Sequence, residues 1–137
     1  SGSTINEPIG RHPKLRTKQA VTDAGKEAIT NFKIQERMGG YSLLNVSLET
    51  GRTHQIRVHL AFINFPILGD SVYGGRKKFA AGTSEAVKKE ILKFPRQALH
   101  AEKLEFIHPK SGKKINYSAK IPKDLIQLIE LLKNLNE

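Results

Sequence analysis

Residues 48–60 read LETGRTHQIRVHL, and this stretch decides how the rest of the chain is interpreted. After Arg52 the apolar residues recur at helical spacing, which predicts a helix that continues to Asn64. They form two stripes, Ile56, Leu60 and Ile63 on one side and Val58 and Phe62 on another. A helix that is apolar on two sides is expected to be largely enclosed by its own protein. Thr50 or Thr53 is predicted to cap its start, and Phe65–Pro66 to end it.

One cation, Arg57, projects between the two apolar stripes of this helix. A guanidinium stays protonated and is costly to bury without a partner. Arg57 is therefore expected to meet a carboxylate, a phosphate or a ring of carbonyl groups. The spacing leaves two interpretations open: an internal salt bridge that only holds the fold together, and a pairing that serves function.

The two histidines of the stretch, His54 and His59, do not form a metal site by their spacing. They are five residues apart, whereas helical zinc motifs place two histidines four apart on one face. The chain also has no cysteine, so we expect no metal. His54 could act as a general base only beside a nucleophile, and no GxSxG elbow is present. A hydrogen-bonded packing histidine is the favoured interpretation.

The segments before the stretch predict a β-hairpin. Residues 27–36, EAITNFKIQE, alternate apolar and polar side chains, as a strand with one buried face does. A turn at Met38–Gly40 leads to a second β-rich run at residues 41–48. Residues 4–26 contain prolines, glycines and many charges and are predicted to form an extended arm or loop.

The segments after the stretch complete an α+β pattern. We predict a tight connection at 66–75, a short helix at 85–92, a strand at 99–107, a turn at 108–113, a strand at 115–121 and a last helix from Pro122 that carries Leu125, Leu128, Ile129 and Leu132. This order indicates one domain over residues 1–137, with a mixed, mainly antiparallel sheet and flanking helices.

Asp70 lies in the tight connection, directly after Gly69. It could be a lone acid catalyst, but an aspartate in a Gly-Asp turn more often makes a local hydrogen bond to the backbone. The connection carries no glycine-rich phosphate-binding motif.

The charge of the chain favours a polyanionic partner. Its 137 residues hold 23 Lys plus Arg against 13 Asp plus Glu, a net charge of +10 with neutral His. The excess is clustered, mainly in residues 11–26 and 76–93, as expected for contact with a phosphate backbone. No apolar run approaches the roughly 20 residues of a membrane span, and no leader opens the sequence. We expect a cytoplasmic protein that contacts no membrane.

Four segments together resemble the RluA-type family of RNA pseudouridine synthases. They are LETGRTHQIRVHL (48–60), FPILGDSVYGG (65–75), LHAEKLEFIHPKSG (99–112) and INEPIGRHPKLR (5–16), and the similarity runs in register from about residue 5 to 121. The resemblance implies part of the pseudouridine synthase catalytic fold and an isomerase that converts uridine to pseudouridine in structured RNA, ribosomal or transfer, with ribosomal favoured. It implies no cofactor and no metal. A family aspartate in an HRLD-type motif attacks a nucleotide flipped from its stack.

This sequence departs from the family pattern because it contains no HRLD-type motif. Its three aspartates, Asp23, Asp70 and Asp124, do not match the family nucleophile, nor is the family tyrosine motif present. We therefore expect the chain to be the C-terminal portion of a catalytic domain, inactive by itself, with residues 1–4 as a candidate cloning remnant. The alternatives are a non-catalytic basic RNA-binding module with the same fold and a structural basic domain without an RNA role.

The resemblance also carries residue roles. Arg57 would pair with the absent catalytic aspartate, so that its counter-ion would lie outside these 137 residues. Leu99 would lie near the target base, and Arg52, His54 and Gln55 would contact substrate or support local structure. The residues expected to contact RNA phosphates are Arg11, Lys14, Arg16, Arg76, Lys77 and Lys78. Half a sheet would have an open edge, and we expect an isolated chain to dimerise or exchange strands.

Overall fold

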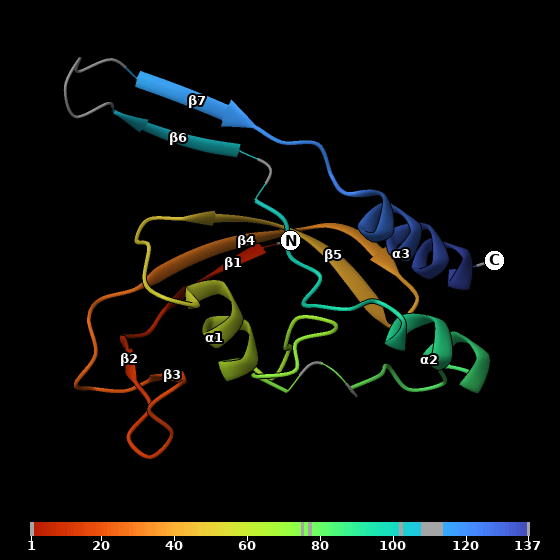
Figure 1. Cartoon of the computed structure of the whole chain (residues 1–137), viewed down its shortest axis with the longest axis horizontal. Coiled ribbons are helices and arrows are strands. Elements are labelled where there is room, and N and C mark those ends of the chain that lie inside the picture. Colours follow the sequence, from red (N-terminus) through yellow and green to blue (C-terminus); the bar gives the residue numbers. More distant parts are fainter. Residues whose placement is uncertain (1, 75, 77, 102, 108–113, 137) are drawn as a thin grey trace.

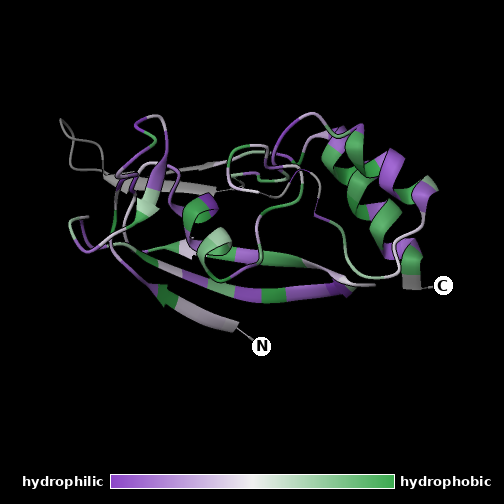
Figure 2. Ribbon diagram, turned by 90° about the horizontal axis from the view of Figure 1, so that it is seen from below, coloured by the Kyte–Doolittle hydropathy of each residue, from purple (hydrophilic) through white to green (hydrophobic). Residues whose placement is uncertain are grey.

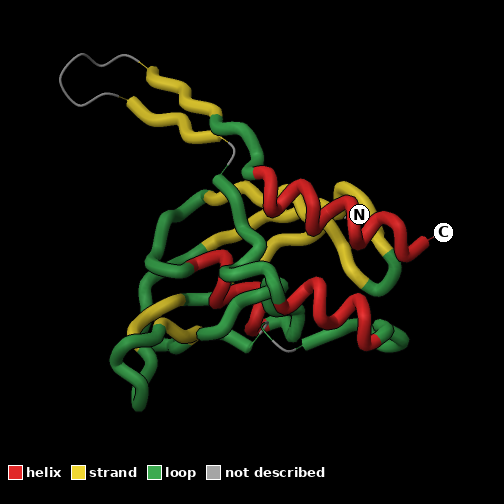
Figure 3. Tube along the Cα trace, turned by 45° about the vertical axis from the view of Figure 1, so that its right-hand side comes forward, coloured by secondary structure: helices red, strands yellow, loops and turns green. Residues whose placement is uncertain are grey.

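A three-stranded antiparallel sheet forms the centre of the computed structural model, which describes residues 2–74, 76, 78–101, 103–107 and 114–136. Its strands lie in the order β1 (Gly2–Asn6), β4 (Ile29–Met38) and β5 (Tyr41–Leu48). Two smaller hairpins pair β2 (Ile9–Arg11) with β3 (Gln19–Val21), and β6 (Lys103–Ile107) with β7 (Lys114–Ser118). The helices are α1 (Gln55–Phe62), α2 (Glu85–Leu92) and α3 (Lys123–Lys133), followed by a 3-10 turn at Asn134–Asn136. Figure 1 shows α1 beside the sheet and the β6–β7 hairpin projecting beyond it, as does Figure 3.

The predicted hairpin and the α+β class are confirmed. Met38 pairs with Tyr41 across the turn, where Gly39 has the positive φ of 64° that a glycine adopts without strain. A bulge between Ile34 and Glu36 shifts the register once. The alternating pattern of the sequence appears in Figure 2 as alternating hydrophobic and hydrophilic bands along the long strands.

The first 26 residues are more ordered than the predicted arm. β1 adds to the free edge of β4, with Ile5 opposite Thr30, and Ile5 is buried. Only one residue of β1 is buried, so the strand has too little alternation to be seen in the sequence. It exists because a partner strand far along the chain offers unpaired backbone groups.

Three clusters of buried residues hold the elements together, and one of them, Ile9, Ala28 and Val58, packs β2 against α1. Ile5, Leu60 and Ile67 pack with the half-buried Phe32 between α1 and the sheet. At the end of the β4–β5 hairpin, helices α2 and α3 bury Met38, Ile91, Phe94, Leu125, Leu128 and Leu132. The last helix thus buries three of the residues that the spacing predicted, while Ile129 is half-buried.

Helix α1 is shorter than predicted, and it is largely enclosed as predicted, except at Phe62. It ends at Phe62, whose side chain is 50 % exposed, and Asn64 turns the chain with a φ of 68°. Neither predicted threonine caps it: the N-cap is His54, which makes no side-chain capping bond. The Thr50 hydroxyl instead accepts from the Ile29 amide, because it lies beside the first residue of β4.

The other predicted helix and strands are present, but some of them begin at other residues than predicted. Helix α2 has the predicted bounds, whereas β6 and β7 begin at Lys103 and Lys114. The predicted turn at 108–113 lies outside the described residues. Among the described helices none is long and apolar enough to cross a membrane.

Candidate functional site

The candidate site is built around an ion pair between Arg57 and Asp70. Arg57 Nε and Nη2 donate to the two carboxylate oxygens of Asp70, each over 3.0 Å. The Asp70 side chain is fully buried, and that of Arg57 is 13 % exposed. Asp70 Oδ1 also accepts from the amides of Val72 and Tyr73, at 3.0 and 3.1 Å. The hydrogen bonds predicted between Asp70 and its local backbone are therefore confirmed. The same carboxylate also binds the buried Arg57 guanidinium.

The expectation that the counter-ion of Arg57 lies outside the chain is wrong. Asp70 comes from the connection after α1, which folds back so that its carboxylate meets the guanidinium. Gly69 makes this return possible: it has a φ of 83°, and a Cβ at this position would collide with the Arg96 carbonyl. The helical spacing predicts which side of the helix carries Arg57. It does not predict the path of the later loop that carries Asp70.

The ion pair keeps both groups charged. Burial opposes ionisation of Asp70, but the hydrogen bonds from Arg57 and from the Tyr73 and Val72 amides outweigh it, so the pKa of Asp70 lies below its ordinary value. The hydrogen bond to Asp70 raises the pKa of Arg57 above its ordinary value. Asp70 is thus a permanent anion near neutral pH, which argues against the lone acid catalyst.

The lowered pKa of Asp70 predicts acid sensitivity with a defined sign. A carboxyl whose pKa is lower in the folded than in the unfolded state stabilises the fold above the unfolded value, about 3.9 for aspartate, and this contribution is lost as the pH falls through the folded value. Urea unfolding at a series of pH values should show stability falling below about pH 4, and less steeply in Asp70→Asn. If the free energy of unfolding falls equally steeply with pH in the two proteins, protonation of Asp70 is not linked to unfolding.

Tyr73 joins this pair to His54 and to the β2–β3 hairpin. The Arg57 guanidinium carbon lies 5.0 Å from the centre of the Tyr73 ring. The Tyr73 hydroxyl is 2.8 Å from His54 Nδ1 and accepts from the Gln19 amide over 3.0 Å. His54, predicted as a hydrogen-bonded packing histidine, is hydrogen-bonded but exposed, and its φ of 55° is left-handed. Sequence reasoning assigned no role to Tyr73, since only contacts between distant segments define its position.

Gln55 supports the site from within the fold, which is the local-structure alternative of its prediction. Its Oε1 accepts from the Thr50 hydroxyl and the Arg52 amide, at 2.8 and 3.0 Å. Its Nε2 donates to the Ile29 carbonyl and the Thr30 hydroxyl, at 3.0 and 2.9 Å. The side chain is buried, and these four bonds use the whole amide. Arg52 Nε in turn donates to the Glu27 carbonyl over 2.7 Å.

His59 is a second buried polar group, for which the sequence analysis excluded a metal site but assigned no partner. Its Nε2 lies 2.8 Å from the Glu7 carbonyl and must donate to it, so Nδ1 accepts from the Thr30 hydroxyl over 2.7 Å. The imidazole is fully buried and its two nitrogens are used. It therefore fastens α1 to β4 and to the segment after β1.

The cations predicted to contact RNA divide into two groups. Arg11, Lys14 and Arg16 are exposed in and beside the loop between β2 and β3. Arg76 is half-buried, and its guanidinium donates to the Phe94 and Leu92 carbonyls at the end of α2, at 2.6 and 3.0 Å, so its contact with RNA stays a prediction. Lys78 is exposed, and its ammonium donates to the Asn64 carbonyl.

For two further predicted residues, Lys77 and Leu99, the structure does not test the expected contact. Lys77 lies outside the described residues. Leu99 is 36 % exposed and follows Ala98, whose amide donates to the Leu68 carbonyl over 2.8 Å. Leu99 therefore lies beside the connection that carries Asp70, and its contact with a target base stays a prediction.

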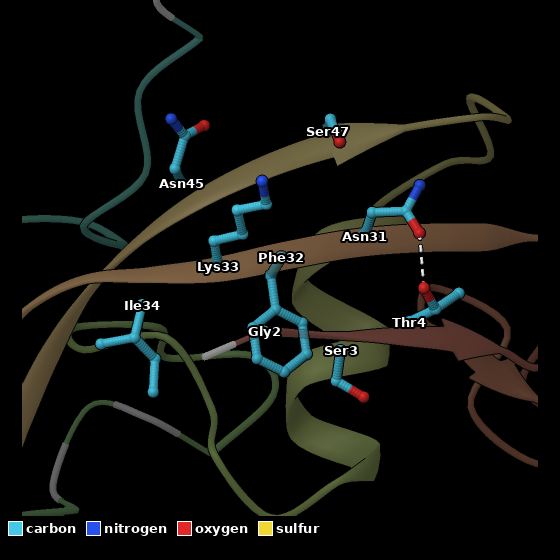
Figure 4. Close-up of a pocket in the computed structure, with 9 residues that line it drawn as sticks. All are labelled: Gly2, Ser3, Thr4, Asn31, Phe32, Lys33, Ile34, Asn45 and Ser47. Carbon is cyan, nitrogen blue, oxygen red and sulfur yellow. Dashed lines mark hydrogen bonds between the residues drawn. The ribbon is translucent and has the colours of Figure 1, made fainter.

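A separate hollow lies on the three-stranded sheet and contains none of the predicted site residues. Figure 4 shows the side chains of Asn31, Lys33 and Asn45 standing along β4 and β5, with Thr4 donating to Asn31 over 2.6 Å. The lining residues are Gly2, Ser3, Thr4, Asn31, Phe32, Lys33, Ile34, Asn45 and Ser47. This surface carries one cation and no acid, so it offers no pair for acid–base chemistry.

Comparisons with known proteins agree with this fold. A family model described as RNA pseudouridylate synthase matches residues 1–62. The chain is 49 % identical, over 97 % of its length, to ribosomal large subunit pseudouridine synthase D of Xanthomonas campestris pv. campestris and to that of Escherichia coli K12. It spans about 40 % of the length of these relatives.

Similar solved structures also come from RNA pseudouridylate synthase proteins. Human RNA Pseudouridylate Synthase Domain Containing 1 superposes with a TM-score of 0.69 at 26 % identity, covering 96 % of this chain and 52 % of that one. Human RNA Pseudouridylate Synthase Domain Containing 4 shares the fold, with a TM-score of 0.64 at 22 % identity over 97 % of this chain and 57 % of that one. The architecture is therefore that of the RNA pseudouridine synthases. Within this class, the chain belongs to the RluA-type family and covers part of its catalytic domain.

Proposed function

We propose that this chain is the C-terminal portion of the catalytic domain of a longer pseudouridine synthase that isomerises uridine in large-subunit ribosomal RNA. The identity to the ribosomal large subunit enzymes supports the substrate, and the share of their length that the chain spans supports a longer protein. Such an enzyme would act in the cytoplasm, where bacterial ribosomal RNA is made.

The observation that carries this proposal is the edge of the Arg57 guanidinium that Asp70 does not occupy. A guanidinium has five N–H donors, and Asp70 takes two of them, one on Nε and one on Nη2. Arg57 keeps a 13 % exposed side chain, so a second anion can approach its remaining donors. Asp70 would then hold Arg57 in place, and Arg57 would orient the nucleophilic aspartate of the remaining domain.

An arginine beside the nucleophile has a direct chemical consequence. A nearby positive charge favours the ionised form of a carboxyl, and attack on a nucleotide requires that form. Asp70 cannot serve as the nucleophile, because it is fully buried and its oxygens accept four hydrogen bonds. Of the other aspartates, Asp124 is held by Arg96 over 2.6 Å, and Asp23 is exposed in a turn.

The proposal is tested by an assay of the chain and of the longer protein side by side. Each is incubated with a transcript of large-subunit ribosomal RNA, and pseudouridine is measured by mass spectrometry of the digested RNA. The longer protein should form pseudouridine and residues 1–137 alone should not. Efficient turnover by the chain alone would show that its nucleophile lies within it.

The three exposed cations Arg11, Lys14 and Arg16 give a prediction for RNA affinity. Each phosphate contact contributes about 0.7–0.9 to the slope of log affinity against log salt. Replacing all three with glutamine should therefore lower this slope by about 2 in fluorescence anisotropy titrations of a ribosomal RNA fragment. Replacing Lys120, Lys123 and Lys133 with glutamine removes the same charge near α3 and should change the slope less. Equal losses in the two variants would show that only net charge matters.

A non-catalytic RNA-binding module is the second candidate. It is favoured by the same exposed cations together with the absence of an HRLD-type motif. It predicts salt-dependent RNA binding by a protein that never forms pseudouridine, even when it is tested at its full natural length.

We also propose that the isolated chain self-associates through its sheet. In the described part of the chain β1 and β5 form the two edges of the three-stranded sheet, and exposed edges pair with other strands. Light scattering at increasing concentration should show a dimer, and a monomer at high concentration would contradict this.

A further inference from the structure

The basic β2–β3 hairpin and the Arg57–Asp70 pair are connected by the side chain of Tyr73. The Tyr73 hydroxyl accepts from the Gln19 amide, the first residue of β3, over 3.0 Å. Its ring lies under the Arg57 guanidinium, 5.0 Å from ring centre to Cζ, and 5.5 Å from the Lys18 ammonium. The backbone amide of Tyr73 donates to Asp70 over 3.1 Å. One residue thus contacts both the basic hairpin and the buried ion pair.

The hairpin is built to hold its cations in a fixed arrangement. The His12 amide donates to the Lys18 carbonyl, and the Lys18 amide to the Leu15 carbonyl, both over 2.9 Å. The His12 ring accepts from the amides of Lys14 and Leu15 through Nδ1, at 3.1 and 3.0 Å. The tip that carries Lys14 and Arg16 therefore has a defined shape, and it projects away from the sheet in Figure 1.

The position of the hairpin is set by the contacts that anchor it to the rest of the chain. At its start, Ile9 exchanges two backbone hydrogen bonds with Lys26, each over 2.9 Å. Where β3 begins, the Gln19 amide is held by the Tyr73 hydroxyl. Ile9 is also buried with Val58 of α1, and Val21 and the Tyr73 ring pack against them. The Tyr73 hydroxyl adds a hydrogen bond between β3 and the residue that packs on Arg57.

We propose that Tyr73 is a positioning residue that sets the basic hairpin relative to Arg57. RNA phosphates held by the hairpin would then place the target nucleotide in register with the catalytic site. This inference rests on the proposed function. It assigns separate tasks to the two parts of Tyr73: the ring packs on Arg57, and the hydroxyl fixes the hairpin and His54.

Tyr73→Phe separates these tasks, because it keeps the ring and removes only the hydroxyl. Tyr41→Phe is a matched control: the Tyr41 hydroxyl also bonds a side chain and a backbone amide, those of Thr83 and Ala80 at 2.8 and 3.1 Å. Both variants lose the same kinds of bonds, but Tyr41 lies where β5 begins, in the cluster with α2 and α3.

The first measurement is amide hydrogen exchange by NMR on residues 1–137. In Tyr73→Phe the Gln19 amide should exchange at least about fivefold faster, as expected for one lost hydrogen bond. The Arg57 Nε proton should remain protected by Asp70. In Tyr41→Phe the Ala80 amide should exchange faster and Gln19 should not change. An unchanged Gln19 rate in Tyr73→Phe would overturn the proposal.

The second measurement is kinetic and uses the longer protein. Because the hairpin cations are intact, the affinity of Tyr73→Phe for ribosomal RNA should stay within about twofold, while misplacement lowers kcat about tenfold or more. Tyr41→Phe should keep both values. An unchanged kcat in Tyr73→Phe, or the same loss in both variants, would overturn the proposal. If the wild-type protein forms no pseudouridine, the proposed function fails, and Gln19 exchange alone decides whether Tyr73 holds the hairpin.

Discussion

Replacing Asp70 with asparagine is expected to lower the free energy of unfolding of residues 1–137 by about 3 kcal/mol near neutral pH. The substitution keeps the shape and the turn oxygen that accepts from Val72 and Tyr73. It removes the negative charge that neutralises Arg57, whose side chain is only 13 % exposed. A guanidinium left in this position without a counter-ion carries most of its desolvation penalty unopposed. Urea unfolding monitored by circular dichroism measures the change.

Asp124→Asn is the matched control for this prediction. Asp124 makes a similar two-pronged bond to Arg96, at 2.6 and 3.1 Å, but the two side chains are 43 % and 40 % exposed. Water already solvates this pair, so its loss should destabilise the chain far less. Equal effects of the two substitutions would contradict the claim that burial makes the Arg57–Asp70 pair important.

Replacing Gln55 with leucine is expected to cost about 2–4 kcal/mol, even though the side chain is buried and leucine is apolar. The loss arises from the groups left behind, since the Arg52 amide and the Ile29 carbonyl would each lose a partner. The Thr50 and Thr30 hydroxyls would lose one bond each. Because these groups connect α1 to the start of β4, the substitution should also loosen the site.

Gln127→Leu provides the comparison, because Gln127 is exposed on α3 and the same change there removes no buried bond. It should alter stability by about 0.5 kcal/mol or less. The same urea experiment decides between the two outcomes. A Gln55→Leu variant as stable as the wild type would mean that its four hydrogen bonds contribute no net stability.

The elements that sequence reasoning predicted well are those whose information is local. Each of them depends on neighbours a few residues away: the alternation of β4, the β-rich composition of β5, the helix at 85–92, and the spacing of Leu125, Leu128 and Leu132. The family motifs added the class of enzyme, because they are long and occur in register over most of the chain.

The parts that sequence reasoning missed depend on contacts between distant segments. Strand β1 forms only because β4 offers it an edge, and Asp70 reaches Arg57 only because the loop turns back at Gly69. The sequence does not show that the side chains of Gln55 and Arg76 bond backbone carbonyls of the chain itself. A buried polar side chain can only be separated from a functional one when its partners are known.

The ion pair also changes what Arg57 can do in an enzyme. An arginine held on one edge by Asp70 and packed on the Tyr73 ring is already oriented before any further group arrives. A second carboxylate would then meet a fixed donor set and would not have to order a flexible side chain, which lowers the cost of assembling the site.

The most direct test of this account is the single-turnover rate of pseudouridine formation by the longer protein carrying Arg57→Gln. Thermal unfolding identifies whether the variant is folded, and Arg57→Lys supplies a charged comparison that stabilises Asp70. If Arg57 orients the nucleophile, the rate should fall at least about a hundredfold in folded Arg57→Gln, with partial recovery in Arg57→Lys. A folded Arg57→Gln protein that forms pseudouridine at the wild-type rate would show that this arginine serves only the fold.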